Sequence, residues 1–487
     1  MPAASDSRRD FLLKAVTAGA VSAARASAQT AKPNIVYLHS HDSGRYLQPY
    51  GHAVPTPNLQ RLAGEGVLFR RAFSAAPTCS PSRSGLLTGQ CPHRSGMLGL
   101  AHRGFSLNDY RQHILHTLRP AGYHSVLAGL QHIAADAKTI GFDEVLQPKS
   151  TRAADVAPGA VEFLSRAHNA PFFLDVGFFE THREFFEPSS IRDVLYSRPP
   201  ENVPDNAQTR RDMASFRASA RALDQGVGTV LNALEESGVA DNTLVFLTTD
   251  HGLAFPDAKC TMYDRGIGVM LLMRGPGGFE RGRVSDALVS HLDLYPTVCD
   301  VVGLEHPLWL EGTSLLPLVR GDVAEVHEEI FAEVTYHAAY EPQRAVRTNR
   351  YKYMRRYDDQ HPGRVLANLD DSLTKEVLLA AGWAEVAPPW EALFDLWLDP
   401  EEGNNRIDDP ALAGVAEDLR GRLRNWMVRT GDPLIHGPVP PGEGTFVNTA
   451  DQVSASDPTT PPSPRSATHS RRARNVAETS NSSDPTG

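Results

Sequence analysis

Five short apolar runs constrain the fold more than any other feature of this sequence. They cover residues 34–38, 125–128, 172–178, 243–247 and 269–273. Apolar and polar residues do not alternate within them, so they are typical of strands buried on both faces, as in a parallel sheet between helices. Helical segments are expected between the runs: one begins at Pro57 with Thr56 as its cap, and another spans 209–237. This alternation predicts an α/β fold with a mostly parallel sheet flanked by helices.

The pattern changes after about residue 325. Four short strands separated by turns are expected at 329–334, 343–347, 351–356 and 393–396, and a closing helix at 413–428. We therefore predict a catalytic domain over 33–325 and a smaller C-terminal α+β unit with a small antiparallel sheet over 326–432. From about residue 438 the chain is rich in Pro, Ser and Thr without periodicity, which predicts a disordered tail over 438–487.

The N-terminus has the features of an export signal. Residues 7–14, Ser-Arg-Arg-Asp-Phe-Leu-Leu-Lys, are similar to the twin-arginine translocation motif, and an apolar run of small residues follows at 15–24. The triplet Ala26-Ser27-Ala28 offers a cleavage site. We predict a signal peptide over 1–28, the twin-arginine translocase as a maturation partner, and a mature protein in the periplasm or outside the cell. Later runs are too short to predict an integral membrane segment.

Charge and cysteine content narrow the function classes. The formal net charge is −10 and the sequence has no basic face, so a nucleic-acid partner is not expected. The four cysteines are Cys79, Cys91, Cys260 and Cys299. Their spacing fits neither a zinc knuckle nor a disulfide framework, so stability is expected to come from the core.

Four of the predicted strands run into reactive side chains. The endings are His39-Ser40-His41-Asp42, Gln131-His132, Glu180-Thr181-His182 and Asp250-His251-Gly252. Because sites in open α/β sheets form where parallel strands end, these side chains are expected to converge. Imidazoles and carboxylates are ligands for divalent metals. Taken singly, each of these residues could equally be a satisfied loop residue.

Cys79 is expected at the beginning of a further helix. Pro81 can open a helix that runs to about Leu87 and ends at Gly89. The free N–H groups of a helix N-terminus favour an anion, and Arg83 adds a planar donor for sulfate or phosphate. Local physics alone leaves open a buried structural cysteine.

The run Cys79-Ser80-Pro81-Ser82-Arg83-Ser84-Gly85-Leu86-Leu87-Thr88-Gly89 resembles the sulfatase signature C-x-P-S-R-x-x-L-x-T-G. Further sulfatase landmarks follow in the expected order: Pro33 to Val36, Thr56 to Leu59, Asp250 to Gly252 and Leu393 to Pro400. The resemblance covers about residues 33–430 and implies an alkaline-phosphatase-like fold. Within the family, the runs 96–100 and 223–228 look like the N-sulfoglucosamine sulfohydrolase branch.

The resemblance implies that a formylglycine-generating enzyme converts Cys79 to formylglycine, whose gem-diol attacks the sulfur of a sulfate ester or sulfamate, here on a sulfated sugar. The implied catalytic side chains are Cys79, Arg83, His132, His182 and Lys259. The implied metal ligands are His41, Asp42, Cys79, Asp250 and His251. Calcium is the first expectation for the divalent metal; manganese and zinc are alternatives because two imidazoles make the site softer.

Three positions depart from the family pattern, one of them His251, a variation that the family tolerates. His41 stands where the family usually has an acidic residue, and Leu130 stands where it has a sulfate-binding lysine, a contact for which Arg45 is a hypothetical substitute. His337 and Arg344 of the C-terminal unit are candidate substrate contacts. Two alternatives stay open: a phosphonate or phosphate ester hydrolase of the same superfamily, and a non-catalytic glycan-binding relative.

Overall fold

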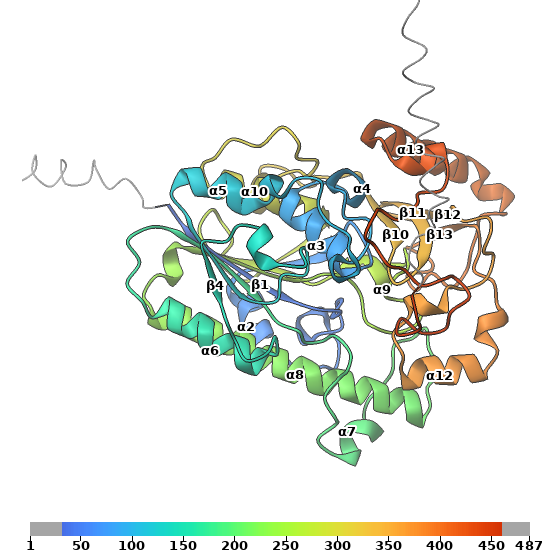
Figure 1. Cartoon of the computed structure of the whole chain (residues 1–487), viewed down its shortest axis with the longest axis horizontal. Helices are drawn as coiled ribbons and strands as arrows, with labels where there is room; N and C mark the ends of the chain where they lie inside the picture. Colours follow the sequence, from blue (N-terminus) through green and yellow to red (C-terminus); the bar gives the residue numbers. More distant parts are fainter. Residues whose placement is uncertain (1–31, 460–487) are drawn as a thin grey trace, which may run out of the picture.

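The computed structural model describes residues 32–459, and a nine-stranded sheet forms its centre (Figure 1). The strands are β1 (Asn34–Ser40), β2 (Val67–Phe73), β3 (His124–Gly129), β4 (Glu144–Leu146), β5 (Phe172–Gly177), β6 (Thr243–Thr249), β7 (Gly268–Val269), β8 (Leu271–Arg274) and β9 (Arg283–Ser290). Their order is β4-β3-β5-β1-β6-β8-β2-β7, with β9 paired to β2. The fold class is therefore the predicted one.

Strands β4, β3, β5, β1 and β6 run parallel, so their carboxyl ends lie at one edge of the sheet. The predicted strand 269–273 is different. It is divided between β7 and β8, and β8 pairs antiparallel with β6. The expectation that it belongs to the parallel set is wrong, because an apolar run reports burial on both faces but not strand direction.

Helices cover both faces of the sheet (Figure 1). They are α2 (Pro57–Glu65), α3 (Cys79–Thr88), α4 (Pro92–Ser95), α5 (Ile114–Leu118), α6 (Ala153–Leu164), α7 (Ile191–Leu195), α8 (Ala207–Glu236), α9 (Asp264–Ile267), α10 (Leu294–Val302), α11 (Leu316–Arg320), α12 (Leu373–Ala380) and α13 (Ala413–Thr430). Alternate residues of β1 enter two cores. Val36 and Leu38 pack with α2, α6 and α8, whereas Ile35 and Tyr37 pack with α3, α5 and α10.

The second sheet is antiparallel and has the predicted four strands, β10 (Glu329–Tyr336), β11 (Tyr340–Thr348), β12 (Tyr351–Arg356) and β13 (Glu391–Asp395). Helix α13 packs on it through Leu423 and Trp426, against Tyr353 and Leu393. The sheet borders the catalytic sheet on the side where β10 lies near β9.

The predicted disorder from residue 438 is wrong for the described part of that segment. Asn448 pairs with Ala339 in a parallel bridge, and its side chain accepts a hydrogen bond from Arg103 at 2.9 Å. Lys375 donates to the carbonyl of Val453. A polar composition does not prevent packing when the backbone finds partners of this kind. Residues 1–31, with the predicted signal peptide, and 460–487 lie outside the described residues.

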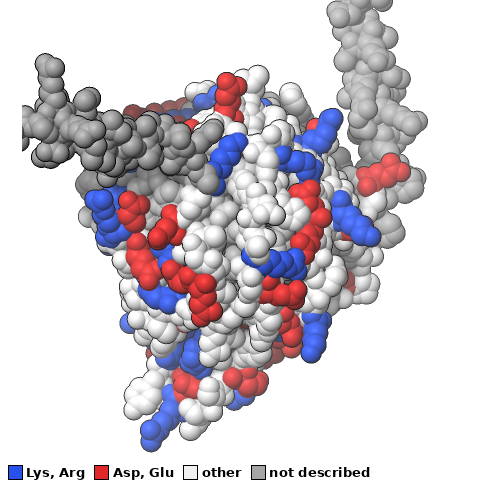
Figure 2. Space-filling model, turned by 90° about the vertical axis from the view of Figure 1, so that its left-hand side faces the viewer, with Lys and Arg blue, Asp and Glu red and all other residues white. Residues whose placement is uncertain are grey.

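Acidic and basic side chains are interspersed on the face that Figure 2 shows. Within residues 32–459, no helix combines the length and the apolar character that crossing a bilayer requires.

Helix α2 is capped from a distant helix, and the prediction that Thr56 caps it is wrong. The Thr56 hydroxyl donates to Val54 O and accepts from Gln48 N instead. The carboxylate of Asp224 on α8 accepts from Leu59 N at 2.9 Å and from Asn58 N at 3.2 Å. A long-range cap of this kind ties α2 to α8, and local sequence rules do not reveal it.

Replacing Asp224 with alanine should lower the free energy of unfolding by about 1–3 kcal/mol, because two buried N–H groups lose their acceptor. Urea unfolding followed by circular dichroism measures the change. The exposed Asp241 provides a control, since Asp241→Ala removes a carboxylate of the same kind from the surface. Equal stability of the two variants would contradict the capping role.

Candidate active site

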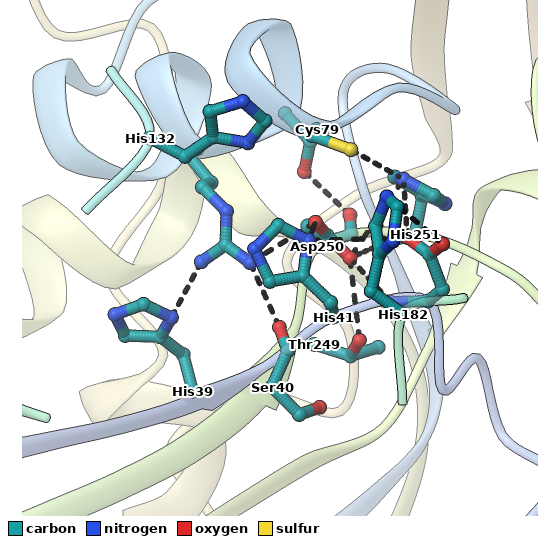
Figure 3. A network of polar contacts seen from close by, with 12 residues as sticks. His39, Ser40, His41, Cys79, His132, His182, Thr249, Asp250 and His251 are labelled. Atoms are coloured by element: carbon teal, nitrogen blue, oxygen red, sulfur yellow. Dashed lines mark hydrogen bonds and ion pairs between the residues drawn. The ribbon is translucent and has the colours of Figure 1, made fainter. Parts of the chain in front are cut away.

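The four reactive strand endings converge at the carboxyl edge of the sheet, beside the first residue of α3 (Figure 3). His41 and Asp42 follow β1, and His132 follows β3. His182 follows β5, and Asp250 and His251 follow β6. Helix α3 supplies Cys79 and Arg83, and its ten residues are all buried. Every side chain of the predicted catalytic and metal-binding sets therefore lies in or beside one cluster.

A compact group of ligand atoms lies at the centre of this cluster. One ligand atom from each of His41, Asp42, Cys79 and Asp250 lies within 4.8 Å of the others, and all four residues are buried. His251 adds a fifth donor: its Nε2 is 3.1 Å from Asp42 Oδ1 and 3.4 Å from Cys79 Sγ. His251 Nδ1 donates to the carbonyl of Gly252, so Nε2 is the ring nitrogen that faces the cluster.

Several atoms of the cluster lack hydrogen bonds although they are buried. Both ring nitrogens of His41 and Oδ1 of Asp42 have no hydrogen-bond partner among the described residues. His41 Nδ1 lies 3.0 Å from Asp250 Oδ2, but not in hydrogen-bond geometry. Buried polar atoms without a hydrogen-bond partner destabilise the folded state unless another group binds them. Two imidazoles with two carboxylates are a donor set that suits a divalent cation. The residues therefore fit a metal.

Arg83 is held by a buried chain of partners. Its Nη2 donates to Asp250 Oδ2 at 3.0 Å and to the carbonyl of Ser40 at 2.9 Å. Its Nη1 donates to His39 Nδ1, and His39 Nε2 donates to Asp175 Oδ1 at 2.9 Å. Sequence reasoning missed the role of His39 and Asp175. Each of these two residues is a titratable side chain within an otherwise mostly apolar strand, and this could have identified them in the sequence.

Burial and charge set the protonation states of the central pair. Burial raises the pKa of the Cys79 thiol well above its usual value; Lys259 opposes this shift, and Asp250 adds to it. Although burial alone would raise the pKa of Asp250, the neighbouring His251 and Arg83 hold it well below its usual range. The cluster therefore contains an ionised carboxylate beside a protonated thiol, which is a weak nucleophile.

Lys259 connects the metal-ligand group to the C-terminal unit. Its Nζ lies 2.9 Å from Asp42 Oδ2 and 2.9 Å from Asp370 Oδ2. Burial favours the neutral amine, but Asp370 and Asp42 raise the pKa of Lys259 well above its usual value. Lys259 thus carries a fixed positive charge in the cluster. Asp370, which precedes α12, was not among the predicted site residues because no local motif marks it.

Histidines line the open side of the cluster. His182 Nε2 is 4.0 Å from Asp42 Oδ2, and the side chain is 26% exposed. His182 Nδ1 donates to the carbonyl of Arg183, so Nε2 is the ring nitrogen that faces the cluster. His132 hydrogen-bonds to His102, a residue that the sequence did not single out. Burial is the main factor that lowers the pKa of both His132 and His102, so both rings are neutral at pH 7.

Two hypothetical sulfate or substrate contacts are wrong. Arg45 donates to the carbonyl of Ala72 and lies over the ring of Phe73, so it does not replace the lysine that Leu130 lacks. Arg344 is fully buried and forms an ion pair with Asp432 at 2.6 Å inside the C-terminal unit. His337 is buried, and burial lowers the pKa of its imidazole well below the usual value. The nearby Lys259 adds to this shift and Asp370 opposes it.

Two family profiles match this chain. The profile of the Sulfatase family matches residues 33–304, and that of the N-sulphoglucosamine sulphohydrolase C-terminal region matches residues 250–376. Human N-sulphoglucosamine sulphohydrolase is 30% identical over 466 residues, which cover 83% of this chain and 92% of the human protein. An ulvan-active sulfatase of Formosa agariphila is 29% identical over 423 residues, covering 84% and 83%.

Solved structures share the fold. BT4656, in complex with its substrate D-glucosamine-2-N,6-O-disulfate, superposes with a TM-score of 0.66 at 19% identity, covering 84% of this chain and 99% of the other. BT1596, a 2-O GAG sulfatase, gives a TM-score of 0.66 at 22% identity, covering 87% and 99%.

Proposed function

The chain belongs to the sulfatase family, whose relatives act on sulfated sugars or glycosaminoglycans, and from this premise we propose a reaction. We propose that the protein hydrolyses a sulfate ester or sulfamate on a sulfated sugar, with formylglycine made from Cys79 and one divalent metal. The observation that carries the proposal is the meeting of four strand endings at Cys79, where carboxylates, imidazoles and Arg83 surround one buried position.

Formylglycine at position 79 would supply a hydrated aldehyde as the nucleophile and would return to the aldehyde when sulfate leaves. The raised pKa of the Cys79 thiol supports this conversion, because a buried, protonated thiol attacks poorly. The metal would offset the charge of the sulfate and favour ionisation of the nucleophile. Its proposed ligands are His41, Asp42, position 79, Asp250 and His251.

The remaining side chains have roles that follow from where they lie. Arg83, held rigidly by Asp250 and Ser40, presents a fixed positive charge beside position 79. Lys259 adds a second positive charge for the sulfate. His182, which is partly exposed with Nε2 facing the cluster, is placed to give a proton to the leaving amine or alcohol. His132 accepts the proton of a hydroxyl at position 79.

Parallel assays with N-sulfoglucosamine, an aryl sulfate and an aryl phosphate test the proposal. Turnover of either sulfated compound, with loss of sulfur from the tryptic peptide 72–83 in mass spectrometry, is the expected result. Turnover of the phosphate alone would support the phosphonate or phosphate ester hydrolase instead. The match of residues 250–376 to the N-sulphoglucosamine sulphohydrolase profile favours N-sulfoglucosamine among the three substrates.

Metal removal should abolish turnover. The relative affinity for different metals added back should show whether His41 is a ligand. Calcium is the family-based expectation, whereas the imidazoles of His41 and His251 increase the affinity for manganese and zinc. We expect His41→Asp to raise the affinity for calcium relative to zinc by about 10-fold or more. Metal content by mass spectrometry and the thermal midpoint with each ion measure this independently of activity. An unchanged ratio would remove His41 from the ligand set.

Maturation partners remain predictions. Export by the twin-arginine translocase depends on residues 1–28, which lie outside the described residues. The proposal of a formylglycine-generating enzyme depends on the signature at 79–89. A periplasmic or extracellular location follows only if the export signal works, and fractionation of the native host with and without Arg8 and Arg9 tests it.

A further inference from the structure

His102 lies outside the set of side chains that the family resemblance implies, yet it contacts one of them directly. Its Nδ1 is 2.9 Å from Nε2 of His132. The two rings are inclined by only 12°, and their centroids are 5.2 Å apart. Because the nitrogens are much closer than the centroids, the rings meet edge to edge, which is the geometry of an in-plane N–H···N hydrogen bond.

The other nitrogen of His132 faces a different environment. Nδ1 is buried and has no hydrogen-bond partner among the described residues, and the ring lies beside Cys79 (Figure 3). Two neutral imidazoles can share a hydrogen bond in two ways. If His102 donates, His132 Nδ1 carries a proton and faces position 79 as a donor. If His132 donates, its Nδ1 is a free acceptor.

We propose that His102 is a positioning residue that accepts the Nε2–H of His132 and thereby keeps His132 Nδ1 free to take a proton from position 79. This inference rests on the proposed sulfatase function. In the transfer, the O–H bond at position 79 breaks, an N–H bond forms at His132 Nδ1, and the electron pair stays on oxygen. The imidazolium that results keeps its bond to His102, which strengthens because the donor is then charged.

The turn that carries His102 is fixed on both sides. It spans Ala101–Arg103, and the amide of Ala101 donates to the hydroxyl of Ser80, the second residue of α3. Arg103 donates to Asn448 and to the carbonyl of Ala455 in the C-terminal segment. The loop is therefore tied to the helix that carries position 79, and His102 is held in register with His132.

Three variants separate the hydrogen bond from the bulk of the ring. His102→Phe keeps a ring but removes the nitrogen, His102→Asn places a hydrogen-bonding atom near the position of Nδ1, and His102→Ala removes both. With the best sulfated substrate, we expect the Phe variant to lose about 10–100-fold in kcat with little change in KM. The Asn variant should keep most of kcat, and added imidazole should restore part of it in the Ala variant.

The exposed His306, whose partner is Asp300, serves as the matched control through His306→Phe. Equal losses in the Asn and Phe variants would overturn the inference, as would a raised KM at unchanged kcat, which would make His102 a substrate contact. Unchanged kinetics in the Phe variant would overturn it as well, while leaving the proposed function intact. Failure of the proposed function would give a different result: the wild-type protein itself would turn over no sulfated compound.

Discussion

A Cys79→Ala variant should fold, bind substrate and lose turnover by about 10⁴-fold or more, because no other described side chain occupies the position that faces Arg83 and the metal-ligand group. The buried thiol lies 3.4 Å from His251 Nε2, and removing this one small side chain leaves only a small void. Steady-state rates with the best sulfated substrate measure the loss, and the thermal midpoint reports folding.

Cys299 is a matched control for this prediction. It is buried in α10, away from the cluster, and Cys299→Ala removes the same side chain from a core position. We expect Cys299→Ala to lower stability without a comparable loss of kcat. Residual activity in Cys79→Ala at the level of Cys299→Ala would disprove a nucleophile derived from Cys79.

An Asp250→Asn variant should lose bound metal and about 10³-fold in kcat. The substitution keeps the shape of the side chain but removes the charge that pairs with Arg83 at 3.0 Å and lies 3.0 Å from His41 Nδ1. Metal content per protein molecule, measured together with kcat, connects the two losses. The loss of metal and the loss of kcat should vary together, so high metal concentrations should restore part of the activity.

A buried carboxylate outside the cluster serves as the control. It separates the loss of metal and kcat from the loss of stability that breaking any buried ion pair causes. Asp432 pairs with Arg344 at 2.6 Å inside the C-terminal unit. Asp432→Asn should lower the thermal midpoint, as the loss of one partner of a buried pair does, while metal content and kcat stay near wild type. Full metal occupancy in Asp250→Asn would exclude Asp250 as a ligand.

The predictable part of the site follows from one topological rule. Apolar runs 34–38, 125–128, 172–178 and 243–247 identify parallel strands, and the residues that follow them must meet at one edge. The same reasoning does not give strand direction, and it fails where polar or exposed residues interrupt a strand. Arg70 and Arg71 interrupt β2, and the first half of β9 is exposed, so neither strand has a continuous apolar signal.

Long-range partners account for most of what the sequence could not predict. Asp224 caps α2 from α8, and Asp370 reaches Lys259 from the C-terminal unit. Sequence separations of more than a hundred residues leave no local pattern for these contacts. The hydrogen bond between His102 and His132 spans only 30 residues, but it also leaves no local pattern, since it depends on how the turn at Ala101–Arg103 is anchored.

The complete burial of α3 also has a practical consequence for anyone who produces this protein. Cys79 is 1% exposed in the folded chain, so a modifying enzyme can reach it only before the helix packs. Under the proposed chemistry, each molecule that folds first is permanently inactive yet structurally sound. Rapid overexpression should therefore yield well-folded protein of low specific activity, and the fraction of active molecules becomes a measure of the race between modification and folding.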